Sequence, residues 1–101
     1  MALYRWIAKA QSSDLSQWAE VILGSTAISI DRDVSTNQQI FARDPSDASI
    51  PIDERVSVIL SWNDIKQGEA QIEVRSNEPL LKAGTRCELI AKALQQTTLR
   101  P

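Results

Sequence analysis

The sequence predicts an α+β domain, an antiparallel sheet of three to five strands with two helices packed on one face. Three observations indicate this fold class. Residues 55–76 contain two runs of alternating apolar and polar side chains, joined by a polar loop that ends in Gly68, which is typical of a β-hairpin. Two other segments repeat apolar residues with the period of a helix. A sheet with one apolar face needs only one covering layer, which two amphipathic helices supply.

The length of the chain predicts one small domain over residues 1–101, because a second core would need more chain. The clearest break in the pattern is residues 43–54, where two prolines, three aspartates and two serines predict a loop within the domain. Residues 97–101 are expected to form a frayed tail. A ferredoxin-like arrangement that lacks its last strand is one topology that these elements suggest.

The N-terminal residues 2–9 fit two elements. Their alternation favours a strand with Tyr4, Trp6 and Ala8 on one side, whereas the spacing of their other apolar residues suits a helix. Two further strands are predicted along the chain, at residues 26–32 and 38–43.

Residues 13–25 predict the first helix. Its apolar residues follow the i, i+3, i+4, i+7, i+8 spacing of one helical face: Leu15, Trp18, Ala19, Ile22 and Leu23. We expect Asp14 to cap the start of this helix, with Gln17 three residues on, and Gly24 to end it. A strand through residues 19–23 is the competing interpretation, because β-branched residues cluster there.

Residues 84–96 predict the second helix, whose apolar face contains Cys87, Ile90, Ala91 and Leu94. Thr85 and Glu88 have the spacing of a capping box. In that motif the hydroxyl accepts a bond from one free amide of the first turn, and the carboxylate returns to the amide of the capping residue.

The hairpin predicts its own register. Directly opposed residues in an antiparallel pair lie on the same side of the sheet, so the apolar positions of the two strands must face each other. Pairing residues whose numbers sum to 132 achieves this, with Leu60 opposite Ile72 and Ile59 opposite Glu73. A slip by one residue would turn Glu73 and Arg75 towards the core, where unpaired charges cost several kcal/mol.

Composition excludes several classes of function. The net charge is −2, from 11 basic and 13 acidic residues without a basic block, which argues against a nucleic-acid partner. The chain has no histidine, one cysteine and three scattered glycines, so the sequence predicts no catalytic, metal-binding or cofactor-binding residues and no cofactor. Apolar runs are too short to span a membrane, and the single cysteine suits a cytoplasmic protein.

Three features of the sequence remain as candidates for function. Cys87 lies in the first turn of the second helix, where a thiol can become reactive, but its place on the apolar face favours a buried core residue. On the polar face of the hairpin, Ile59 with Glu73 and Arg75 forms an apolar residue with charged neighbours, a pattern that suits a contact with another chain. Trp6 is a further candidate contact residue, because tryptophan is enriched at interface hot spots.

These observations favour a non-catalytic protein-interaction or regulatory module, with a protein partner or a homo-oligomer. The alternative is a small-ligand-binding domain or a carboxylate-based enzyme, which would need a deep pocket with converging polar groups. Residues 68–94, GEAQIEVRSNEPLLKAGTRCELIAKAL, also resemble the C-terminal part of a family of short uncharacterised cyanobacterial proteins. That resemblance implies a bacterial cytoplasmic protein near photosynthetic or housekeeping machinery, and it assigns no catalytic residue.

Overall fold

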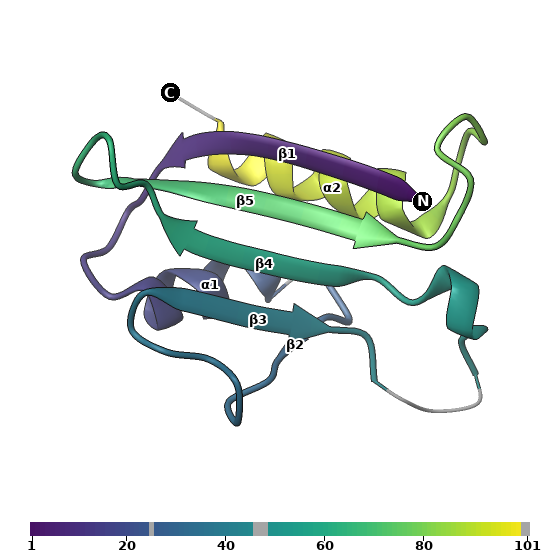
Figure 1. Cartoon of the computed structure of the whole chain (residues 1–101), viewed down its shortest axis with the longest axis horizontal. Coiled ribbons are helices and arrows are strands. Elements are labelled where there is room, and N and C mark those ends of the chain that lie inside the picture. Colours follow the sequence, from purple (N-terminus) through teal and green to yellow (C-terminus); the bar gives the residue numbers. More distant parts are fainter. Residues whose placement is uncertain (25, 46–48, 100–101) are drawn as a thin grey trace.

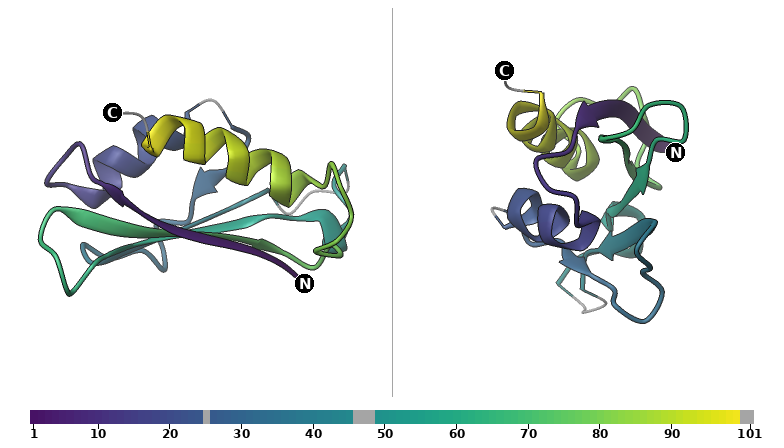
Figure 2. Two further views of the ribbon diagram at one scale, coloured as in Figure 1. Left: turned by 90° about the horizontal axis from the view of Figure 1, so that it is seen from above. Right: turned by 90° about the vertical axis from the view of Figure 1, so that its left-hand side faces the viewer.

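The computed structural model of the chain describes residues 1–24, 26–45 and 49–99. Its strands form one antiparallel sheet, and both helices lie on the same face of that sheet (Figures 1 and 2). In chain order the elements are β1 (Ala2–Lys9), α1 (Leu15–Leu23), β2 (Ser29–Ile30), β3 (Gln39–Arg43), the 3-10 turn η1 (Ile52–Glu54), β4 (Ser57–Trp62), β5 (Glu69–Ser76) and α2 (Arg86–Thr98). The predicted fold class is therefore confirmed.

The strand order is β1-β5-β4-β3-β2, and every pairing is antiparallel. A ferredoxin-like arrangement without its last strand also has its first strand at the edge, and it also crosses through a helix to the far edge. The sheet here differs because four consecutive strands, β2 to β5, return to β1, where that arrangement has two. Here the chain leaves β1, passes through α1 to the opposite edge at β2, and returns strand by strand until β5 pairs with β1. The strand β1 and the helix α2 therefore lie on the same side of the molecule (Figure 1).

The hairpin has the predicted register. Leu60 lies opposite Ile72 and Ile59 opposite Glu73, so the apolar side chains of β4 and β5 share one face. Gly68 has a φ of +85°, which explains why a glycine closes the connecting turn. The ambiguous N-terminal segment is a strand, as its alternation favoured, and it pairs with β5 along its whole length.

The strand predicted at residues 26–32 is much shorter than expected, because β2 contains only Ser29 and Ile30. The cause lies in the residues that follow. The Asp31 carboxylate accepts a bond from the amide of Asp33 at 3.1 Å, and the Ser35 hydroxyl donates to the carbonyl of Asp31 at 2.6 Å. These local bonds turn the chain towards β3 and end the strand.

The helix α1 begins as predicted, because the Asp14 carboxylate accepts bonds from the amides of Ser16 and Gln17 at 3.0 and 3.2 Å. The side chain of Gln17 interacts with the Ser12 hydroxyl at 3.2 Å and so completes no capping box. Gly24 is the C-cap, with right-handed backbone angles. The five apolar residues predicted for the inner face of α1 are all buried, so the strand alternative is wrong.

The start of α2 is held by more than the predicted cap. The Thr85 hydroxyl accepts a bond from the amide of Glu88 at 3.2 Å, as expected, but the Glu88 carboxylate pairs with Lys92 at 3.1 Å. The carboxylate that binds the free amides of the first turn belongs instead to Glu78, which is 6% exposed. Its two oxygens accept bonds from the amides of Arg86 and Cys87, both at 3.1 Å.

The Glu78 carboxylate also accepts a bond from the Ser76 hydroxyl at 2.8 Å, which joins the helix to the end of β5. A second buried carboxylate, Asp44, lies just after β3. One oxygen of Asp44 accepts a bond from the Arg86 guanidinium at 2.7 Å, and the other accepts one from the amide of Val56 at 2.9 Å. The first turn of α2 is thus tied to both halves of the sheet.

The core lies between the sheet and the two helices. Val58, Leu60, Ile72 and Val74 are fully buried from the sheet side, and Cys87 is fully buried from α2, with its sulfur near the carbonyl of Ala2. Burial raises the pKa of the Cys87 thiol. A hydrogen bond with Ser76 opposes that rise, and the negative charge of Glu78 adds to it. Cys87 is a core residue, and its thiol stays protonated well above neutral pH.

The helix α2 extends to Thr98, further than predicted, so residues 97–98 are helical and do not belong to a frayed tail. The Thr98 hydroxyl donates to the carbonyl of Leu94 at 2.7 Å and accepts a bond from the Trp6 indole at 3.0 Å. These two contacts dock the last turn onto β1. The final residues of the predicted tail, 100–101, and part of the predicted loop, 46–48, lie outside the described residues.

We predict that Thr85→Ala lowers the free energy of unfolding by about 0.5–2 kcal/mol, the usual cost of losing an N-cap. Glu78→Ala has a larger cost, about 3 kcal/mol, because it leaves two amides of the helix and a buried hydroxyl without their charged acceptor. Urea denaturation followed by circular dichroism measures both changes. The control is Glu20→Ala, which removes an exposed carboxylate from α1. If Glu78→Ala costs no more than this control, Glu78 does not anchor α2.

We also predict that Cys87 reacts slowly with a thiol reagent in the folded protein at mildly alkaline pH. Its sulfur is buried, and its raised pKa keeps the thiolate population small. The reaction should become fast when denaturant unfolds the chain, and the time course of labelling followed by mass spectrometry checks this. Fast labelling without denaturant would show that Cys87 is accessible and would return it to the candidates for function.

Candidate interaction surface

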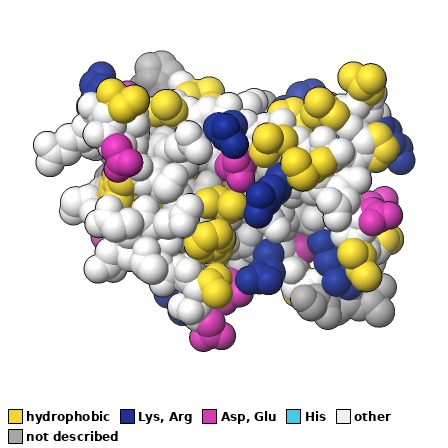
Figure 3. Space-filling view, viewed as in Figure 1, with side chains coloured by type: hydrophobic (Ala, Val, Ile, Leu, Met, Phe, Trp, Pro, Cys, Tyr) yellow, Lys and Arg dark blue, Asp and Glu magenta, His cyan; other side chains and the backbone are white. Residues whose placement is uncertain are grey.

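The face of the sheet opposite the helices is uncovered by any element of the described chain, and it faces the viewer in Figure 3. We call it the open face. By the strand registers it comprises Leu3, Arg5 and Ile7 of β1, Gln39, Phe41 and Arg43 of β3, Ser57, Ile59 and Ser61 of β4, and Gln71, Glu73 and Arg75 of β5. Figure 3 shows apolar side chains in the middle of this face with charged side chains of both signs beside them.

One row of residues crosses the middle of the open face from strand to strand. Phe41 lies opposite Ile59, Ile59 opposite Glu73, and Glu73 opposite Arg5. Phe41 and Ile59 are half-buried, although no layer covers them. They shield each other and are shielded by their polar neighbours, which leaves a small apolar centre within reach of another molecule.

The carboxylate of Glu73 organises the charges around this centre. One of its oxygens accepts two bonds from the Arg5 guanidinium, at 3.2 and 2.6 Å. Its other oxygen lies 3.8 Å from the Arg75 guanidinium. The side chain of Glu73 is only 13% exposed, whereas those of Arg5 and Arg75 are 54% and 48% exposed. A single carboxylate thus faces two guanidinium groups, and the pair of arginines retains net positive charge at the surface.

A third arginine lies on the far side of the apolar centre. Arg43 ends β3 and forms an ion pair with Asp31, which follows β2. Its side chain is 54% exposed, so its guanidinium also remains reachable from solvent. The apolar centre is therefore bordered by cations on both sides, which is a common composition for the rim of a protein interface.

The structure brings together three of the four predicted contact residues. Ile59, Glu73 and Arg75 are neighbours on the open face, as the register predicted. Trp6 lies on the covered side of β1, half-buried, with its indole N–H donated to Thr98 at 3.0 Å. Trp6 is therefore not part of the open face.

Sequence reasoning missed Phe41 and Arg5 as members of this surface. Both belong to strands whose partners are far away in sequence, and Arg5 lies 68 residues from Glu73. A signal was present for Phe41, because the alternation of residues 38–43 puts Ile40 and Ala42 on one side and Phe41 on the other. Nothing in the sequence showed that β3 pairs with β4, which is the pairing that puts Phe41 beside Ile59 on the open face.

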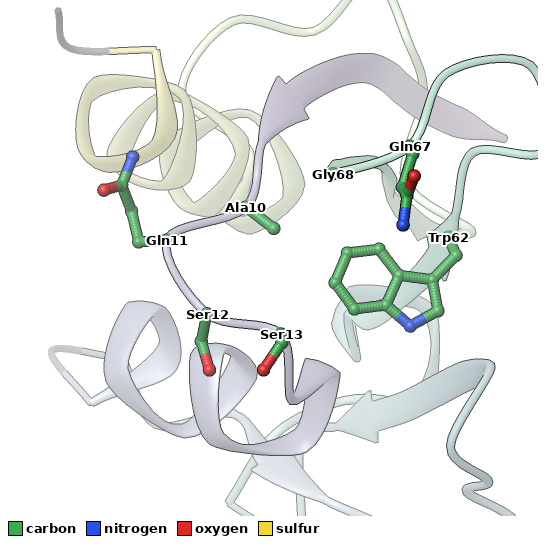
Figure 4. A pocket seen from close by; sticks show the side chains of 7 residues that line it. All are labelled: Ala10, Gln11, Ser12, Ser13, Trp62, Gln67 and Gly68. Carbon is green, nitrogen blue, oxygen red and sulfur yellow. The ribbon is translucent and has the colours of Figure 1, made fainter.

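A hollow lies away from the open face, at the end of the sheet where β1 and β4 finish. It has a volume of about 530 Å³ and is bordered by Trp62 and by two loops (Figure 4). Its lining residues are Ala10, Gln11, Ser12, Ser13, Trp62, Gln67 and Gly68. None of these carries a carboxylate, so this hollow gives no support to the alternative of a carboxylate-based enzyme. Trp62 packs against the edge of the core and forms one wall of this hollow, with its indole N–H donated to the carbonyl of Asn37 at 3.2 Å.

Within the described residues, no group of three or more acidic or cysteine side chains is placed to hold a metal ion. Helices long and apolar enough to cross a bilayer are also absent from that part of the chain. Comparison with known proteins adds no assignment, because no protein-family model, curated protein or solved structure matches the chain.

Proposed function

We propose that the protein is a non-catalytic interaction module that binds another protein through the open face of its sheet. The observation that carries this proposal is the half-buried pair Phe41 and Ile59, exposed on the side of the sheet without helices and bordered by arginines. Apolar centres with charged rims are typical of protein interfaces, and arginine is enriched among the residues that carry binding energy.

The charges on the open face favour one kind of partner. Arg5 and Arg75 share the single carboxylate of Glu73, and Arg75 is the more loosely held of the two at 3.8 Å. A partner that brings a carboxylate to Arg75 completes this ion pair, whereas a cationic partner would be repelled. The partner we propose is therefore a protein surface with an apolar side chain that fits Ile59 and with acidic residues around it.

The open face is also large enough for a specific complex. The molecule measures about 36 × 29 Å across the two axes that the sheet spans. A standard interface buries about 800 Å² on each partner, which a face of these dimensions can supply.

We predict that Ile59→Lys weakens binding of such a partner at least about tenfold, because it places a charge in the apolar centre and adds to the cations around it. The fold should remain intact, with a loss of about 1 kcal/mol or less, since the lysine stem can lie along Phe41. The matched control is Ile65→Lys, the same substitution at a residue of the hairpin turn that is 95% exposed.

Arg75→Glu should also weaken binding of this partner, and raised salt should weaken the binding of the wild type.

The measurement is affinity capture from the native host with the four proteins as bait, followed by binding curves for any protein that the wild type retains. A partner that binds the wild type and Ile65→Lys but neither Ile59→Lys nor Arg75→Glu supports the proposal. Partners that bind all four proteins equally, or the absence of any retained partner, contradict it. A large loss of stability in Ile59→Lys would show that Ile59 belongs to the core.

A further inference from the structure

The two edges of the sheet differ greatly. At one edge β2 contains two residues, and at the other β1 contains eight. Figure 1 shows β1 as the outermost strand on its side, with α2 behind it and β5. A long edge strand offers a row of unpaired backbone groups, which natural proteins commonly protect with a proline, a bulge, charged side chains or a covering element. The strand β1 contains no proline, and its pairing with β5 runs without interruption from Ala2 to Lys9.

The pairing with β5 identifies which backbone groups are bare. The amide of Ala10 donates to the carbonyl of Gly68 at 2.9 Å, which makes these two a hydrogen-bonded pair of the ladder. Backbone groups alternate in direction along a strand, so the even-numbered residues of β1 bond to β5. The amides and carbonyls of Leu3, Arg5, Ile7 and Lys9 therefore point away from the sheet, and no hydrogen bond within the described residues engages them.

We infer that this edge pairs with the β1 strand of a second copy of the chain, which joins the two sheets into one continuous antiparallel sheet. The inference rests on the bare edge and is independent of the function proposed for the open face. A second copy is the occupant that supplies an equally long bare strand of matching pattern, and two-fold symmetry makes the antiparallel direction automatic.

Charge selects the register of this pairing. Outward residues must face outward residues, so the paired numbers have an even sum. A sum of 10 places Arg5 opposite the second copy's Arg5, and a sum of 14 places Arg5 opposite the second copy's Lys9. Both registers put two positive charges directly opposite each other, which is destabilising. A sum of 12 pairs Arg5 with the second copy's Ile7 and Leu3 with the second copy's Lys9. This register avoids directly opposed cations while it overlaps almost the whole strand.

The same register gives Trp6 a role. With a sum of 12, Trp6 lies beside the two-fold axis, directly opposite the second copy's Trp6 on the covered side of the sheet. Its ring is half-buried in the single chain, and its bond to Thr98 holds it in place. Paired aromatic rings across neighbouring strands stabilise a sheet, and tryptophan is prominent at the centres of interfaces. The pairing therefore covers the remaining exposed part of Trp6.

The helices are placed to allow this approach. Because α2 packs on both β1 and β5, it lies behind the gap between these strands (Figure 1). Neighbouring strands are about 4.8 Å apart, so the axis of α2 lies about half a strand spacing to one side of β1. The two-fold axis lies about half a spacing to the other side of β1. The two α2 helices then lie about 10 Å apart, which is an ordinary helix-packing distance.

The test uses Ile7→Pro in the full chain. Proline at this position removes an outward amide but leaves the β1–β5 bonds intact, because the amide of Ile7 does not take part in them. Sedimentation equilibrium over a wide concentration range should show a wild-type dimer and a dissociation constant raised about tenfold or more in Ile7→Pro. The control Ile7→Thr keeps the amide and should still dimerise, as should Ile59→Lys, which leaves this edge untouched.

Amide hydrogen exchange provides a second readout that does not depend on a variant. The amides of Arg5 and Ile7 should exchange slowly in the wild type at high concentration and faster on dilution. The inference is overturned if the wild type is monomeric at high concentration with fast exchange at Arg5 and Ile7. It is also overturned if a dimer forms equally well with Ile7→Pro.

Discussion

The arrangement of this protein depends on two buried carboxylates, Glu78 and Asp44, and on the first turn of α2 that both of them hold. Burying a charge is costly unless hydrogen bonds compensate it, and both groups are compensated by α2 and the sheet together. Glu78 accepts bonds from two amides of the helix and from Ser76, and Asp44 accepts bonds from Arg86 and the amide of Val56. Moving α2 away would leave two charges unpaired inside the protein.

This constraint determines which surfaces remain available. Because α2 is tied to the ends of β5 and β3, it covers the apolar side of the sheet beside α1 and leaves the other side to solvent (Figure 2). The open face and the β1 edge are adjacent, since Arg5 and Ile7 belong to both. Joining two chains at that edge would double the open face into one surface with two apolar centres. A partner that binds both centres would gain in apparent affinity over a partner that binds one.

The parts of the fold that sequence predicted are those that depend on local periodicity. The register of β4 and β5 follows from the parity of their apolar residues, and the start of α1 follows from Asp14. The features that the sequence did not predict depend on contacts between segments that are far apart along the chain. Asp44 appeared as one polar residue of a loop, and its burial depends on Arg86, 42 residues away. The open face was predicted from one hairpin, so Ile59 was found, but Phe41 and Arg5 required the order of the strands.

The central claim is that the helices cover only one side of the sheet and leave Ile59 accessible to a partner. Methyl signals in a nuclear magnetic resonance spectrum, recorded with and without a soluble paramagnetic agent, test it directly. Ile59 and Ile72 belong to paired strands and face opposite sides of the sheet. The account predicts that the agent broadens the methyl signals of Ile59 and leaves those of Ile72 sharp. Equal protection of the two isoleucines would contradict it, because Ile59 would then lie beneath a second covering layer.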